Sequence, residues 1–167
     1  MRPEISAVHK AYTRVKRCVV LASAGLFLMA CPVAASCLDQ GLKLDGAQLR
    51  ATAPNAPVSA GYLQITNQTG QTQTLISVSA PFARTAELHD MKQEGGVMKM
   101  FELDGGLVLP DGLTAALKPM GRHLMFMGLD RQLKQGERFD ITLSFAPCGE
   151  VTLPFSVMKM SGHKHNQ

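Results

Sequence analysis

Short runs of alternating apolar and polar residues follow one another along most of the chain, and glycine, proline, asparagine or aspartate separates them. Alternation with a period of two is typical of β-strands that bury one face, and residues 36–167 have no convincing helical period. Strands are predicted over residues 42–51, 61–67, 72–79, 86–92, 97–103, 113–118, 123–129, 138–145 and 150–157. This spacing predicts one all-β domain, an antiparallel sandwich or barrel, with residues 53–57 as a loop.

The first 35 residues depart from this pattern. Residues 1–17 are polar and basic, and residues 18–30 form an apolar run that is too short for a comfortable membrane span but suits a signal peptide. Small residues at Val33-Ala34-Ala35 predict cleavage before Ser36, so that residues 1–35 are a signal peptide. One alternative is a lipoprotein that is lipidated at Cys31, after Leu28-Met29-Ala30, and another is an uncleaved anchor.

The net charge of the chain lies in this leader. Residues 1–35 hold five of the 17 Lys and Arg and one of the 13 Asp and Glu, which leaves twelve of each sign in residues 36–167. A neutral mature domain lacks the basic surface of a nucleic-acid binder, and no nucleic-acid partner is expected. The mature chain is predicted to be a single domain over residues 36–157 with a flexible tail over 158–167.

Residues 87–129 concentrate one kind of chemistry. They hold His89 and His123, the two histidines outside the chain's ends, and six of the ten methionines. Imidazole and thioether are soft ligands that select Cu(I) over harder ions. A single methionine here is most simply a core residue, since methionine fills gaps in cores. Two histidines among thioethers are not needed by a core, which favours a metal site.

The strand period assigns faces to these residues. A hairpin closed around Glu94-Gly95 would set Met91 opposite Met98 and His89 opposite Met100. On the strand 123–129 one face carries His123, Met125 and Met127. The predicted metal ligands are His89, Met100, His123 and Met125. The methionines at 91, 98 and 127 share these faces and are candidates for supporting roles or alternative ligation, and Met120 is expected in a loop.

The order His89, ten residues, Met100, twenty-two residues, His123-Leu-Met125 resembles the copper-binding signature of the periplasmic copper chaperone PCu(A)C family. The surrounding sequence also resembles this family, in the segments AGYLQITN at 60–67, ELHDM at 87–91, GGVMKM at 95–100, LKP at 117–119 and HLMFMGL at 123–129. In the family, the spacer between the Met and the second His is usually twenty-one residues, one fewer than between Met100 and His123. We assign the extra residue to the turn at 104–106. The resemblance spans about residues 42–157.

This resemblance implies a cupredoxin-like Greek-key sandwich and a periplasmic Cu(I)-binding metallochaperone without enzymatic turnover. Its implied partners are the copper ion and a copper-receiving oxidase subunit or assembly factor. The protein is expected to be a monomer that touches the membrane only if Cys31 is lipidated. A copper-resistance buffer and a cupredoxin-type electron carrier are the alternatives. The latter is disfavoured because blue copper needs a Cys ligand, and none lies near His123 in the sequence.

Two further features bear on metal chemistry. Cys37 and Cys148 are the cysteines left after the leader, and an oxidising compartment predicts a disulfide between them, with thiolate ligation of copper as the alternative. The tail carries Met158, Met160, His163 and His165. Short His-rich tracts bind metals, and family members with similar tails imply an additional site that could take Cu(II); ordinary polar tail residues are an equally good interpretation.

Overall fold

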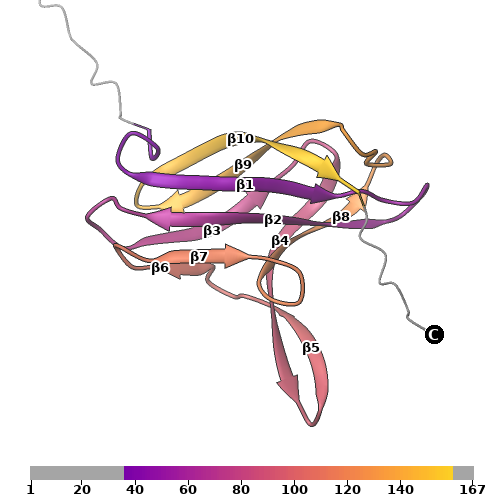
Figure 1. Ribbon diagram of the computed structural model, residues 1–167, viewed down its shortest axis with the longest axis horizontal. Coiled ribbons are helices and arrows are strands. Elements are labelled where there is room, and N and C mark those ends of the chain that lie inside the picture. The colour runs from indigo at the N-terminus through magenta and orange to yellow at the C-terminus, as the bar shows by residue number, and fades with distance from the viewer. Residues whose placement is uncertain (1–35, 160–167) are drawn as a thin grey trace, which may run out of the picture. The chain divides into compact units, whose positions relative to one another are not determined.

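The computed structural model describes residues 36–159, which belong to one compact unit. Ten strands make up this part of the chain, and it contains no helix that could span a membrane. The strands are β1 (Leu42–Arg50), β2 (Val58–Asn67), β3 (Gln73–Ser79), β4 (Ala83–Glu94), β5 (Val97–Glu102), β6 (Leu107–Leu109), β7 (Thr114–Leu117), β8 (His123–Leu129), β9 (Arg138–Ala146) and β10 (Gly149–Met158) (Figure 1). Nine were predicted. β6 was missed because its three residues are too few to display alternation.

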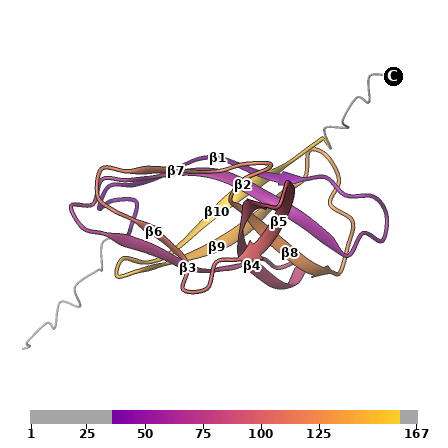
Figure 2. The same cartoon turned by 90° about the horizontal axis from the view of Figure 1, so that it is seen from below.

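The strands form one open sheet in the order β5-β4-β8-β2-β1-β10-β9-β3-β6, and β7 also pairs with β2. The sheet folds over on itself, so that β1 and β7 lie along one side of the domain and β3 and β6 along the other (Figure 2). The expected antiparallel pairing holds except between β1 and β10, which run parallel from Gln48 and Ser156 onward. Parallel neighbours need a long connection, and here most of the domain supplies it.

The core lies between the two layers and fixes the orientation of β8. Leu124 and Phe126 have no exposed surface, and the Phe126 ring lies 5.4 Å from that of Phe82. A Cβ atom at Gly61, on the neighbouring β2, would lie 2.8 Å from the Phe126 ring, so only glycine allows this approach. Burying two large side chains contributes roughly 1.5–3 kcal/mol each. The alternate residues of β8 must therefore face outward.

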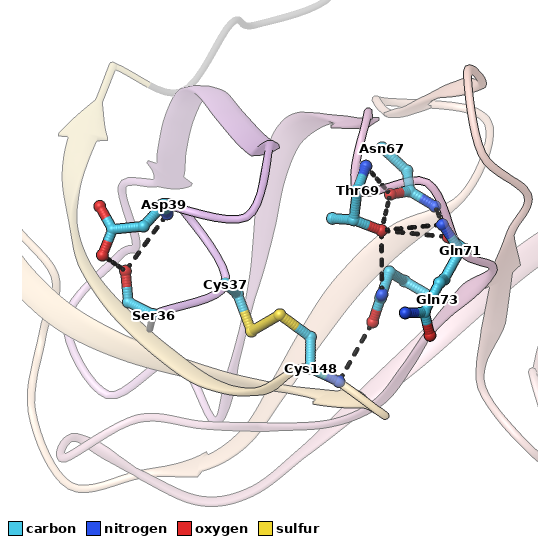
Figure 3. Close-up of a disulfide and its surroundings, with 8 residues drawn as sticks. All are labelled: Ser36, Cys37, Asp39, Asn67, Thr69, Gln71, Gln73 and Cys148. Carbon is cyan, nitrogen blue, oxygen red and sulfur yellow. Dashed lines mark hydrogen bonds between the residues drawn. A yellow bond between two sulfur atoms is a disulfide. The ribbon is translucent and has the colours of Figure 1, made fainter. Parts of the chain in front are cut away.

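A disulfide joins Cys37 to Cys148, as predicted from the expected compartment. It links the turn before β1 to the turn between β9 and β10, and the two Cα atoms are 5.4 Å apart (Figure 3). Gln73 supports the second turn, since its side-chain oxygen accepts a hydrogen bond from the Cys148 amide at 3.2 Å. Both sulfur atoms are used in this bond. The alternative prediction, that a thiolate of Cys37 or Cys148 binds copper, is therefore wrong for this structure.

The leader and most of the tail lie outside the described residues. This applies to the predicted cleavage before Ser36, to lipidation at Cys31, and to copper binding by His163 and His165. These remain predictions.

The disulfide joins residues that are 111 positions apart, so it restricts the conformations open to the unfolded chain. Its loss should raise the entropy of the unfolded state and thereby destabilise the domain. Replacing both cysteines by serine should lower the free energy of unfolding by about 2–5 kcal/mol, measured by urea denaturation. The wild type under reducing conditions should match the double variant, and equal stability of the oxidised wild type and the variant would contradict the structural role.

Candidate metal centre

The hairpin of β4 and β5 carries two of the predicted ligands and projects beyond the rest of the domain (Figure 1). Met91 lies opposite Met100, and His89 lies opposite Glu102. The predicted register was therefore wrong by two residues. A two-residue hairpin turn needs positive φ at its first central position, and the type I′ turn needs it at both. Gly95 and Gly96 supply it, with φ of 60° and 82°. The predicted turn would have forced Glu94 into that region.

The slip by two residues leaves the assignment of faces intact, because strand side chains repeat every two residues. His89, Met91 and Met100 still share one face of the hairpin. Met100 becomes a diagonal neighbour of His89 across the strand pair rather than its direct partner. Diagonal neighbours are still within reach of long side chains such as methionine.

The direct partner of His89 on the other side is His123. The two residues oppose each other in the pairing of β4 with β8, and their ring centroids are 5.9 Å apart at an interplanar angle of 65°. Both are buried, with 8% and 9% of their surface exposed. On the same outward face Met125 lies opposite Glu87, two residues further along. The structure thus brings His89, His123 and Met125 together on adjacent strands.

The hydrogen bonds of the two imidazoles are complementary. His123 Nδ1 lies 2.8 Å from the carbonyl oxygen of Gly121, which can only accept, so this nitrogen carries the hydrogen and leaves the Nε2 lone pair free. His89 Nε2 lies 2.8 Å from Oε2 of Glu87, and His89 Nδ1 is buried without a partner. A buried acceptor left without a partner costs about 1–3 kcal/mol. A bound metal ion would satisfy it.

Access to this face is uneven. Met100 is 48% exposed on the edge strand β5, whereas the two histidines are almost covered. His123, Met125 and Met91 line a hollow of about 950 Å³ that extends over the outer face of β1 and β2. Tyr62 lines the same hollow, and burial raises the pKa of its hydroxyl although Arg50 opposes the shift. The phenol is therefore neutral at physiological pH.

A loop between β7 and β8 borders the hollow and carries Met120, which is 69% exposed, in agreement with its predicted loop position. The loop is closed by a hydrogen bond from the Lys118 amide to the Arg122 carbonyl at 2.7 Å. The Arg122 side chain also donates to Asp90 on β4 at 3.0 Å. Asp90 thus anchors the loop that leads into His123.

The donor set limits which metals would fit. Within residues 36–159 no three or more His, Cys, Asp or Glu side chains gather into a metal-binding group. Zinc and other common divalent ions are usually held by such groups. Two imidazoles with nearby thioethers instead match the preference of Cu(I). The assignment of Met100 and Met125 as ligands remains a prediction.

Sequence reasoning missed two partners of the histidines, the Glu87 carboxylate and the Gly121 carbonyl. Glu87 could have been found, because it precedes His89 by two residues and so shares its strand face. No sequence pattern could have identified the Gly121 carbonyl as a partner of His123, since its position depends on how the loop between β7 and β8 closes.

Comparison with known proteins gives the family. Residues 42–157 match the model of the family described as "Putative lipoprotein LpqE-like". The "Putative lipoprotein Lxx21020" of Leifsonia xyli is 28% identical over 92% of this chain and 96% of its own length. Among solved structures, Cu(I)-bound DR1885 from Deinococcus radiodurans is 30% identical, with a TM-score of 0.51 over 71% of this chain and 77% of its own.

The copper-bound PCuAC domain from PmoF2 shares the fold, with a TM-score of 0.60 and 21% identity over 71% of this chain and 92% of that domain. The predicted cupredoxin-like β fold is therefore confirmed. Together with the family match, these similarities mean that the chain belongs to the LpqE-like family of PCu(A)C-type proteins.

Proposed function

We propose that this protein is an exported Cu(I) metallochaperone that holds its ion with His89, Met100, His123 and Met125. The observation that carries the proposal is the pair of buried imidazoles opposed across β4 and β8, one of which has a ring nitrogen without a partner. Thioether side chains on the same face complete a soft ligand set. Met91, directly opposite Met100, is the nearest alternative thioether.

The names of similar proteins support copper as the cargo and the cell envelope as the location. DR1885 has been solved with Cu(I), the PmoF2 domain with copper, and the Leifsonia protein is described as a lipoprotein. The disulfide of this chain adds independent support for export, because such bonds persist in oxidising compartments. We infer a periplasmic location, either free or lipid-anchored.

The chemistry of the site suits holding and release. Thioethers are uncharged and have no proton to lose, so they bind Cu(I) less tightly than thiolates would. The buried histidines retain the ion, while the exposed Met100 can be replaced by an incoming ligand. We propose that the acceptor is the copper centre of a respiratory oxidase, reached directly or through an assembly factor. Electron transfer of the blue-copper kind is disfavoured because Cys37 and Cys148 are joined.

Removal of one ligand tests the site. His89→Ala should weaken Cu(I) binding by about 100-fold or more, since loss of an outer partner of a metal ligand alone costs about 10–100-fold. Met100→Leu should weaken it less, because Met91 can partly substitute. Both affinities are measured anaerobically by competition with a Cu(I) indicator.

Two matched variants serve as controls. Met98→Leu changes a thioether on the same strand and face as Met100 but opposite Gln93, further from the histidines. Met120→Ala removes the exposed methionine of the loop. Both should bind Cu(I) as the wild type does, and the melting temperature of each variant checks its fold. Equal losses in controls and ligand variants would contradict the proposed ligand set.

Deletion of the gene separates delivery from storage. For a chaperone we expect the activity of copper-dependent oxidase to fall at low external copper and to recover when copper is added. Sensitivity to excess copper with normal oxidase assembly would instead indicate a buffer and would contradict delivery. Complementation with the His89→Ala variant should fail in the first case.

A further inference from the structure

Glu87 contacts the candidate centre without belonging to the proposed ligand set. It precedes His89 by two residues on β4, faces outward with it, and lies opposite Met125 of β8. Its Oε2 atom is 2.8 Å from His89 Nε2, and the side chains of Glu87 and His89 are 31% and 10% exposed. The bond is therefore partly buried, with its His89 end shielded from water, and partial burial strengthens a hydrogen bond that can hold the ring in place.

The bond determines which nitrogen of His89 can bind a metal. A neutral imidazole carries one hydrogen, and an ionised carboxylate can only accept. The hydrogen of His89 therefore sits on Nε2, and the lone pair sits on the buried Nδ1 that has no partner. His123 is held in the opposite sense, because its Nδ1 donates to the Gly121 carbonyl at 2.8 Å.

We propose that Glu87 is the positioning residue of this centre: it fixes the tautomer of His89, so that His89 binds through Nδ1 and His123 through Nε2. The copper part of this inference rests on the proposed function, whereas the tautomers are properties of the protein alone. Each ring is thus oriented by one acceptor, a carboxylate for His89 and a backbone carbonyl for His123, and each acceptor holds the hydrogen on one nitrogen and leaves the other to bind a metal.

The chain offers its own control for this role. Glu102 lies directly opposite His89 on the other neighbouring strand, β5, and its side chain is on the same face. Among the described residues, the His89 ring bonds to Glu87 and makes no hydrogen bond to Glu102. A general effect of negative charge beside His89 would make the two carboxylates equivalent, whereas a positioning role belongs to Glu87 alone.

The first test needs no variant. Long-range ¹H–¹⁵N spectra of the metal-free, histidine-labelled chain distinguish a ring nitrogen that bears hydrogen from one that does not. We expect the Nε2–H tautomer for His89 and the Nδ1–H tautomer for His123. An Nδ1–H tautomer at His89 in the metal-free protein would overturn the proposal.

Variants then test the role of Glu87. Glu87→Leu removes the acceptor, so His89 should lose its fixed tautomer and Cu(I) affinity should fall by about 10–100-fold. Glu87→Gln can still accept through its amide oxygen and should retain the Nε2–H tautomer and most of the affinity. Glu102→Leu should change neither. A Glu87→Leu variant with the wild-type tautomer, or an equal effect of Glu102→Leu, would overturn the proposal.

Copper loading separates this inference from the proposed function. On addition of Cu(I), the ¹⁵N signals of His89 Nδ1 and His123 Nε2 should shift most. Shifts at the other two nitrogens would overturn the positioning role while leaving copper binding intact. If Cu(I) moved no histidine signal in the wild type, the proposed function would fail, and the tautomers of the metal-free protein would still decide whether Glu87 orients His89.

Discussion

The pairing of β4 with β8 is the constraint on which the candidate centre depends. Leu88 and Leu124 oppose each other on the inward face of this pair, and both are buried. Because side chains alternate along each strand, burying these leucines forces His89 and His123 to oppose each other on the outward face. The hydrophobic core thus sets the distance between two residues that are 34 positions apart in the sequence.

The sequence was sufficient for much of this arrangement. Alternation predicted nine of the strands and the faces of His89, Met100 and His123. It could not give the hairpin register, because that depends on which two residues adopt positive φ in the turn, here Gly95 and Gly96. It also could not show that His123 opposes His89, since the pairing of β4 with β8 is a long-range contact that no local pattern encodes.

The proposed centre would combine a protected part with an accessible part. The histidines are buried on the inner strands β4 and β8, whereas Met100 lies on the projecting edge strand β5 and is half exposed. A transfer protein needs both properties, because it must keep its ion from solvent and still offer one bond to an acceptor. The proposed order of exchange, with the thioether leaving before the imidazoles, follows from this difference in exposure.

X-ray absorption at the copper edge of the Cu(I)-loaded protein tests the account most directly. It reports the type of atoms bound to the metal without any substitution in the chain. We predict nitrogen scatterers with the multiple-scattering pattern of imidazole, arising from His89 and His123, together with sulfur scatterers at thioether distance. A copper ion bound by sulfur alone, or by nitrogen and oxygen without sulfur, would contradict a centre built from opposed histidines and flanking methionines.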